Sequence, residues 1–273
     1  MRRGLMVPVI AAAWLATSMA PASAQVLIWS LPKEDGAWVR FEGTYKQTRS
    51  RPNSNAGDEA LQWRSELTIS AVGSETAELD SGKKQACRWI EFKSLTKPDG
   101  LDQELGPGDL FVYKVLIPEE RVIGKPVDND SIPVTFLPIV KGWRKIGQRD
   151  AEAIREKALA VYPTIALVTY YPDLKADAEP SEPLEIAGKE APVRLFKGKR
   201  VFQNASSRST NVGELWLSDA VPFGLARFHV TLAREEKPSS APADEFARAV
   251  FAEVDMSVVA TGNDARSEIG DKP

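Results

Sequence analysis

Apolar and polar residues alternate along much of the chain. From Leu61 to Ala71 the odd-numbered positions are apolar with the exception of Ser65, and the even-numbered positions are polar. A period of two is typical of a β-strand with one face on the core and the other in water. A similar alternation over residues 37–48 predicts a second strand, in which Gly43 marks a bend or a bulge.

Further segments have the length and composition of short strands and are separated by clusters of glycine, proline and aspartate. Many short strands of this kind indicate an antiparallel sheet or barrel rather than alternating βαβ units. The predicted strands are residues 86–95, 110–117, 132–140, 164–170, 193–197, 199–204, 213–218, 224–233 and 248–260.

One of these strands, residues 110–117, is apolar on both faces and therefore needs cover on both sides. A helix over residues 150–162 offers that cover, because Ile154, Ala158 and Tyr162 recur at every fourth position. We expect this helix to lie across the concave side of a curved sheet.

Residues 244–260 begin with helical spacing and end in alternation, so we expect a short helical turn that leads into the last strand. The elements together predict a mainly β (α+β) fold: a curved antiparallel sheet, an unclosed half-barrel, with one or two helices packed on its concave side. The composition, 43% hydrophobic and 27% charged, is that of a globular domain. We expect a single β-rich domain over residues 25–262 and a disordered tail over 263–273.

Residues 1–24 have the features of a secretory signal. Two arginines precede an apolar run, and Ala22-Ser23-Ala24 forms a cleavage site of small residues. The alternative, a membrane anchor, requires about 20 apolar residues, and this run is shorter. We expect cleavage near Ala24 and a soluble periplasmic or extracellular protein with no membrane span.

Cleavage removes two of the 35 basic residues, so the formal net charge changes from −3 to −5. This acidity gives no electrostatic basis for binding nucleic acid. Cys87 is the only cysteine, which excludes a disulfide within the chain. We expect it to be a small buried residue on a strand, with pairing to another chain as the alternative.

The chain lacks the motifs of catalysis and of cofactor binding. His229 is the only histidine, Arg227 and Thr231 share its side of the strand, and no G-x-S-x-G accompanies it. One histidine and one cysteine exclude zinc or copper sites built from several imidazoles or thiolates, and glycine-rich phosphate loops are missing. We expect no cofactor, no metal and no enzymatic activity, with catalysis by carboxylates alone as the remaining enzymatic alternative.

Four aromatic residues are candidates for a ligand groove. Trp89 and Trp216 alternate with polar residues along their strands, which places them on the second face of the sheet. Phe111 and Tyr113 share one side of the strand that is apolar on both faces. The alternative is that helices and loops simply cover these side chains.

A corner between two apolar strands carries Val221-Pro222-Phe223-Gly224, which has the proline and glycine spacing of a type I turn. Pro222 directs the residue before it away from helical backbone, and Asp219 is expected to bond back to nearby amides. Asp219, Pro222 and Gly224 therefore mark a corner that needs no chemistry to explain it.

The string LWLSDAVPFGLARFHV, which contains this corner, resembles a pattern in exported bacterial proteins of the LolA-like superfamily, the lipoprotein-carrier type. The resemblance implies an unclosed β half-barrel whose concave side is plugged by helices and, in the carrier proteins, receives acyl chains. It carries over no ligand-contacting residue. The matching residues are Trp216, Ser218, Asp219, Val221, Pro222, Gly224 and Leu225.

The sequence thus predicts an exported binding protein with an apolar concavity for a lipid, an acyl chain, a lipoprotein or another hydrophobic ligand. The alternative is a non-catalytic structural or interaction module whose open sheet edges or acidic loops meet an envelope protein. An apolar void of about several hundred cubic ångströms on the concave side favours the first function, and a filled core favours the second.

Overall fold

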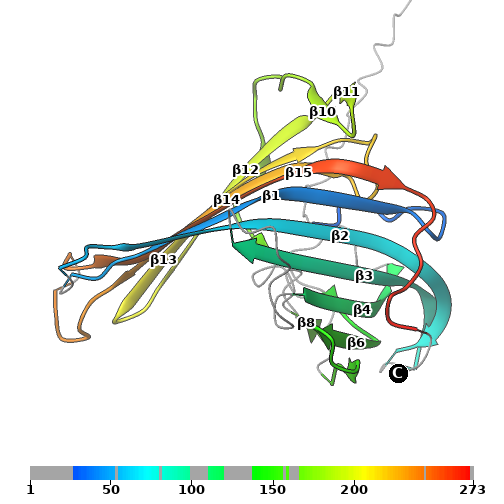
Figure 1. Ribbon diagram of the computed structural model, residues 1–273, viewed down its shortest axis with the longest axis horizontal. Helices are drawn as coiled ribbons and strands as arrows, with labels where there is room; N and C mark the ends of the chain where they lie inside the picture. The colour runs from blue at the N-terminus through cyan, green and yellow to red at the C-terminus, as the bar shows by residue number, and fades with distance from the viewer. Residues whose placement is uncertain are drawn as a thin grey trace, which may run out of the picture.

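Two series of hairpins build the main sheet of the protein. The computed structural model describes residues 27–52, 55–79, 82–98, 110–119, 137–155, 158–159, 166–242 and 244–270. Within these residues eleven strands pair in the order β7-β6-β4-β3-β2-β1-β15-β14-β13-β12-β9, and the sheet is curved and unclosed (Figure 1). All of these pairings are antiparallel, which confirms the predicted mainly β, unclosed sheet.

The strands of this sheet differ widely in length, and those at the two edges are the shortest. Two further pairs, β5 with β8 and β10 with β11, form small sheets of their own. The bounds are β1 Trp38–Arg49, β2 Glu59–Glu78, β3 Lys84–Pro98, β4 Leu110–Pro118, β5 Leu137–Pro138, β6 Lys141–Ile146, β7 Glu152–Ala153, β8 Ala158–Leu159, β9 Lys175–Ala176, β10 Leu184–Ile186, β11 Lys189–Ala191, β12 Arg194–Gln203, β13 Ser207–Leu217, β14 Leu225–Glu236 and β15 Ala247–Gly262.

The strands β1 and β15 join the two series at the centre of the sheet. Phe41 of β1 lies opposite Leu67 of β2 on one side and opposite Val258 of β15 on the other. The register between β1 and β15 shifts between Arg40 and Phe41, where Val259 of β15 is the extra residue, and it is regular at Gly43, where the sequence predicted a bend or a bulge. The first and last strands are therefore neighbours.

Alternation along these strands puts apolar side chains on one face, which we call the inner face, and polar ones on the other, the outer face. Burying a large apolar side chain contributes roughly 1.5–3 kcal/mol, so this face supplies much of the stability. Chain segments outside the sheet cover it. The buried cluster joins Phe41, Ile69, Phe92, Val115, Phe228 and Met256 of the sheet to Leu27, Ile28, Val168, Tyr171 and Phe223 of the covering segments.

The prediction of a helix over residues 150–162 is wrong for the described part of this segment, which forms two short strands. Residues 152–153 are β7, which pairs with β6, and residues 158–159 are β8, which pairs with β5. The amide of Ile154 donates to the carbonyl of Gly142 at 2.8 Å, and its side chain packs against the core. An apolar spacing that suits a helix is thus satisfied by pairing with a neighbouring strand; the Tyr162 end of the segment lies outside the described residues.

The second expected helix is also wrong, because the last strand, β15, already begins at Ala247. In the part of the chain that the structure describes, no helix packs on the concave side of the sheet; loops and short strands cover it instead. The strand predicted over 164–170 is not formed by its described residues, 166–170. The segments 193–197 and 199–204 belong to one strand, β12, which runs straight through Gly198.

The C-terminal residues 264–270, which we call the strap, lie across the outer face of β3 and β4, although the sequence predicted a disordered tail (Figure 1). Two side chains buried beneath the strap hold it. The carboxylate of Glu91, 4% exposed, accepts hydrogen bonds from the amides of Glu268 at 3.0 Å and Ile269 at 3.4 Å. The ammonium of Lys114, 3% exposed, donates to the carbonyl of Ile269 at 3.0 Å.

Cys87 is fully buried on β3, as the sequence predicted, and burial raises the pKa of its thiol. The predicted leader, residues 1–24, lies outside the described residues. Among the residues that the structure describes, no helix combines the length and the hydropathy of a membrane span.

Candidate functional site

The corner between β13 and β14 has a different turn from the one expected. The amide of Gly224 donates to the carbonyl of Val221 at 3.0 Å, which closes the four-residue turn. Phe223 at its third position has φ 66°, a left-handed value that a type II turn requires and a type I turn does not. Such backbone is unfavourable for a bulky residue, but Phe223 is 1% exposed and its carbonyl accepts the amide of Trp29 at 2.8 Å. Packing therefore fixes the corner.

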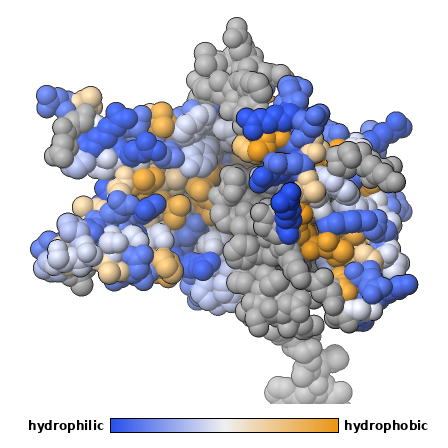
Figure 2. Space-filling view, turned by 90° about the horizontal axis from the view of Figure 1, so that it is seen from below, coloured by the Kyte–Doolittle hydropathy of each residue, from blue (hydrophilic) through white to orange (hydrophobic). Residues whose placement is uncertain are grey.

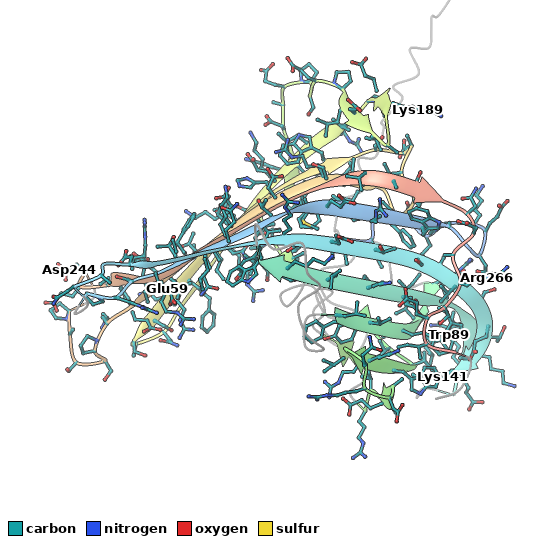
Figure 3. The ribbon with its side chains drawn as sticks, viewed as in Figure 1. Glu59, Trp89, Lys141, Lys189, Asp244 and Arg266 are labelled. Carbon is teal, nitrogen blue, oxygen red and sulfur yellow. The ribbon has the colours of Figure 1, made fainter. Side chains whose placement is uncertain are left out.

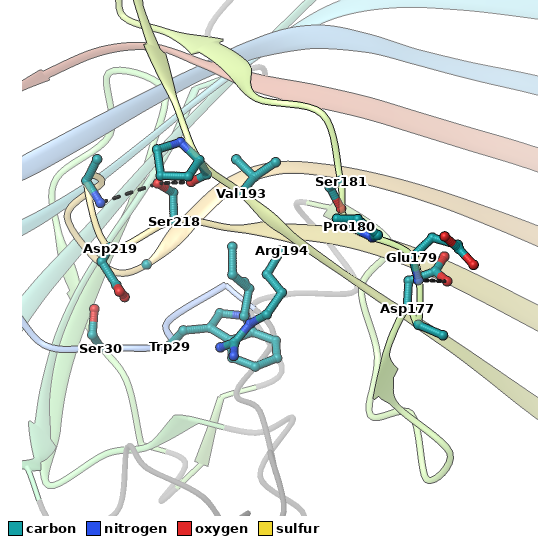
Figure 4. A pocket seen from close by; sticks show the side chains of 15 residues that line it. Trp29, Ser30, Asp177, Glu179, Pro180, Ser181, Val193, Arg194, Ser218 and Asp219 are labelled. Carbon is teal, nitrogen blue, oxygen red and sulfur yellow. Dashed lines mark hydrogen bonds between the residues drawn. The ribbon is translucent and has the colours of Figure 1, made fainter.

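Ser218 performs the bonding that the sequence assigned to its neighbour Asp219. The Ser218 hydroxyl accepts the amide of Ala220 at 3.3 Å and donates to the carbonyl of Pro192 at 2.9 Å. Asp219 is exposed, and its side chain lies at the rim of a hollow (Figure 4). Ser218 thus stabilises the corner, while the carboxylate of Asp219 is exposed to solvent at the hollow.

This corner hollow has a volume of about 740 Å³, within the range of small-molecule sites (Figure 4). Trp29 and Arg194 lie in its middle, and both contact the ring of Phe196, at 5.2 Å in each case. Asp177 at one side pairs with Lys197 at 2.6 Å, and this hydrogen bond lowers the pKa of the carboxyl and raises that of the amine. The lining mixes charged, hydroxyl and apolar groups, so this is not the apolar void that the sequence predicted.

A second candidate surface continues from the core along the inner face. We call this part of the sheet the arm; it extends away from the core in Figures 1 and 3, with Glu59 and Asp244 near its end. It comprises residues 45–49, 59–63, 200–211, 232–236 and 247–252.

Burial falls along the arm from one row of paired residues to the next. Val230 and Val254, opposite each other, are at most 1% exposed. In the same row Tyr45 and Trp63 are only half-buried, and their rings meet edge to face at 5.3 Å. The next row contains the half-buried Leu61 and Leu232 and ends at the exposed Arg200. Figure 2 shows hydrophobic residues between hydrophilic ones along this face. The apolar inner face therefore runs on past its cover.

Tyr171 covers the start of the arm over a pair of glycines. Gly198 and Gly213 lie opposite each other, and a Cβ at either would come within 2.5 Å of Tyr171. The Tyr171 hydroxyl donates to the side-chain oxygen of Asn211 at 2.6 Å, and Asn211 donates to the carbonyl of Leu167 at 2.8 Å. Because glycine has no side chain, Gly198 and Gly213 let the segment that carries Tyr171 pack directly against the backbone of β12 and β13.

Burial raises the pKa of the Tyr171 hydroxyl above its ordinary value of 10.0. Above pH 10 the unfolded chain loses this proton while the folded chain retains it, so the free energy of unfolding falls as pH rises. We expect Tyr171→Phe to reduce the total fall between pH 9 and 11 by about 1.4 kcal/mol, measured by urea unfolding across that range. Burial also raises the pKa of Tyr45 and Tyr113, so part of the fall remains. An unchanged slope in the variant would contradict the assignment to Tyr171.

Beside Tyr171 the inner face of the arm has a smaller hollow of about 210 Å³. Arg200 lies in it and donates to the hydroxyl of Thr169 at 2.8 Å, a neutral partner. Phe202 at the same place is 58% exposed. The hollow is lined by Leu167, Thr169, Arg200, Phe202, Ser209, Asn211 and Leu232.

The structure does not bring the four predicted groove residues together. Trp89 and Trp216 lie on the outer face, as expected, but four strands separate β3 from β13, a distance of roughly 24 Å. Trp89 stacks on Trp143 at 5.3 Å, and Trp216 lies under Arg227 at 4.8 Å. The two indoles therefore belong to separate clusters.

Phe111 and Tyr113 lie on the inner face and stack on each other at 6.5 Å, with Tyr113 buried in the core. The alternation in the sequence placed Trp63 and Tyr45 on the apolar sides of their strands, and Arg200 and Leu232 were not singled out. In the sequence, the only indication that these residues share a face is their alternate spacing along each strand. Which residues lie opposite one another depends on the register between strands, which the sequence does not specify.

His229 lies on the polar outer face, as its neighbours predicted. Its ring contacts Glu253 at 3.0 Å and Glu214 at 3.5 Å, both on adjacent strands. Arg227 and Asp255 form a two-pronged pair beside them at 2.8 and 3.0 Å. These contacts are a ladder of charges between strands, which stabilises a sheet face without providing a nucleophile.

Comparison with known proteins assigns no family, since no family model matches the chain and no curated protein matches its sequence.

Proposed function

We propose that the protein is a non-catalytic binding protein that holds an amphiphilic ligand, an apolar chain with an anionic head group, on the inner face of the arm. The observation that carries the proposal is the row Leu61-Gln47-Ala252-Leu232-Asn211-Arg200, in which two leucines are left half-buried and an exposed guanidinium lies at the end. The sequence features of a secretory signal support an exported location for this activity.

The apolar part of the site consists of side chains that a monomer normally covers. Leu61, Trp63 and Leu232 face the same side as the fully buried Val230 and Val254 and continue that surface. The row from β2 to β12 crosses six strands, roughly 24 Å, which suits a long acyl chain. An apolar chain lying there removes its own surface and that of the arm from water.

The charged part of the site favours an anion. Arg49 and Arg51 both approach Glu59, at 3.7 and 2.6 Å, and Arg234 pairs with Glu236 at 2.8 Å. Arg208 likewise pairs with Glu235 at 2.6 Å, so these four arginines already have a carboxylate partner. Arg200 donates to a hydroxyl rather than to a carboxylate, so it is the guanidinium best placed for a ligand's carboxylate or phosphate.

The resemblance of the β13–β14 corner to the lipoprotein-carrier type of protein supports the same ligand class, since those carriers receive acyl chains. The 740 Å³ corner hollow is less suited to an acyl chain, because Asp177, Glu179, Arg194 and Asp219 contribute to its lining. We therefore assign the apolar chain to the arm.

The test is titration with a dansyl-labelled fatty acid, followed by its fluorescence. We expect Leu232→Asp to weaken binding at least tenfold, because it puts a carboxylate into the apolar row. Val212→Asp is the matched control: Val212 is 38% exposed on the outer face of β13, and its substitution should leave binding unchanged.

Displacement by unlabelled ligands tests the head group. Palmitate should displace the probe at lower concentration than hexadecanol does, and Arg200→Ala should remove most of that difference. Equal binding by the wild type and Leu232→Asp, or no binding at all, would refute the proposal.

A further inference from the structure

The two edges of the main sheet are protected to different extents. At one edge β7 is only two residues long and carries Glu152, paired with Arg144 at 2.8 Å. Short, charged strands of this kind prevent further pairing. At the other edge β9 pairs only with Phe196 and Lys197 of β12, although β12 continues to Gln203. Among the described residues, no strand pairs with the last part of β12 on the side away from β13.

The backbone groups on this open stretch follow from the bonds made just before it. The amide of Leu195 donates to Ser181 and the carbonyl of Leu195 accepts from Asp177, so its polar groups point away from β13. Alternation of hydrogen bonding in an antiparallel pair then directs the N–H and C=O of Val201 and Gln203 to the same side. The amide of Lys199 is bonded to Asp173 at 2.7 Å, which marks where the open stretch begins.

The side chains on this stretch are unusually exposed for their size. Val201 is 52% and Phe202 is 58% exposed, and all of residues 199–206 are exposed. Val201 lies on the outer face and Phe202 on the inner face, so a strand added here would contact an apolar side chain on each face. An open edge with apolar residues is a template for another strand.

The charge of β12 indicates which kind of strand fits. Its sequence RLFKGKRVFQ carries Arg194, Lys197, Lys199 and Arg200 and no acidic residue, in a chain whose net charge is negative. Lys197 is paired with Asp177, which leaves Lys199 and Arg200 beside the open stretch. A second copy of this edge would bring like charges together, whereas an acidic segment would neutralise them.

We propose that an extended acidic segment of another polypeptide adds to the sheet as a strand alongside Lys199–Gln203. Backbone bonds to Val201 and Gln203 supply its affinity, and carboxylates beside Lys199 and Arg200 select its sequence. This surface shares Arg200 with the proposed ligand site on the inner face, whereas Lys199 and the outward-pointing backbone groups of Val201 and Gln203 belong to the strand edge alone.

The experiment is fluorescence anisotropy with a labelled seven-residue peptide of alternating glutamate and valine. Val201→Pro removes the outward-pointing amide at an edge position where proline is tolerated, and we expect it to weaken binding at least tenfold. Val201→Thr keeps the amide and the branched side chain, and it should bind as the wild type does. Thermal unfolding of both variants checks that the sheet is intact.

Charge is tested with the same peptide in which lysine replaces glutamate; we expect it to bind at least tenfold more weakly. Equal binding by the lysine peptide, or wild-type binding by folded Val201→Pro, would overturn the proposal. So would sedimentation showing a wild-type dimer that Val201→Pro abolishes, because a second copy would then occupy the edge. Leu232→Asp should leave peptide binding unchanged, which separates this result from failure of the fatty-acid site.

Discussion

Gly43→Ala is expected to lower the free energy of unfolding by about 3 kcal/mol or more, the largest effect of the substitutions considered. A Cβ at position 43 would lie 1.9 Å from the carbonyl oxygen of Asp255 and 2.9 Å from the Cα of Met256. Both atoms belong to the backbone of β15, which cannot move aside without breaking its register with β1. Overpacking against a side chain already costs about 1–3 kcal/mol, and here the clash is with main chain.

Urea unfolding followed by tryptophan fluorescence measures this effect. Gly270→Ala is the matched control, because nothing lies within 4 Å of a Cβ at that position. It should stay within about 0.5 kcal/mol of the wild type, as surface substitutions usually do. A Gly43→Ala protein as stable as this control would show that β1 and β15 do not approach each other so closely.

Glu91→Ala is expected to lower the free energy of unfolding by about 2–3 kcal/mol and to release the strap. Hydrogen bonds to charged groups are worth about 1.5–3 kcal/mol, and loss of this carboxylate leaves the strap amides without their acceptor. The Ser267 hydroxyl loses Glu91 as an acceptor at 2.8 Å and keeps only the carbonyl of Ile269 within the strap itself. Ile269, 3% exposed, should then come into contact with water.

Hydrogen exchange at the amides of Glu268 and Ile269 reports the release directly, and urea unfolding gives the energy. Glu42→Ala is the control, since Glu42 pairs with Arg40 at 3.3 Å with both side chains nearly half exposed, and such pairs contribute at most about 1 kcal/mol. Slow exchange that persists in Glu91→Ala would mean that Lys114 holds the strap without the carboxylate.

The period-two alternation was enough to predict the long strands and an open antiparallel sheet. It located β1, β14 and most of β2, in which apolar and polar residues alternate, whereas β4 was located by its short apolar run, which is buried on both faces. It ended β2 too early because the register shifts between Ala71 and Gly73, after which the strand continues to Glu78. A bulge exchanges the two faces, so the pattern of apolar positions is interrupted where the strand is not.

The failure to predict β6 and the wrong prediction of a helix over residues 150–162 have one cause in common. Lys141–Ile146 has three charged residues and one glycine among its six. Gly142 is needed because β4 lies close: a Cβ there would be 2.9 Å from the carbonyl oxygen of Lys114. With β6 unrecognised, nothing in the sequence indicated that residues 152–154 had a strand to pair with. Their helical spacing therefore seemed decisive, but long-range pairing overrides local preference.

The candidate site on the arm could not be predicted from the sequence, because it too depends on long-range strand pairing. Trp63 was correctly placed on the apolar side of its strand, but its half-burial reflects where the cover over the inner face ends. Over β12 and β13 that cover includes Tyr171, which lies on Gly198 and Gly213, and these two glycines become neighbours only through the register of the two strands. The strap likewise has no apolar periodicity, and its order comes from two buried charges on strands far away in the sequence.

The pairing of the first strand with the last has a consequence for the time course of folding. Hairpins within each half can form as soon as their residues emerge, but the seam between the halves joins segments about 200 residues apart and must wait for the final strand. Such distant pairing slows folding, and until it forms each half exposes one bare strand edge. A newly synthesised chain is thus held incomplete until residue 262 has been made, because the seam lacks its second strand before then.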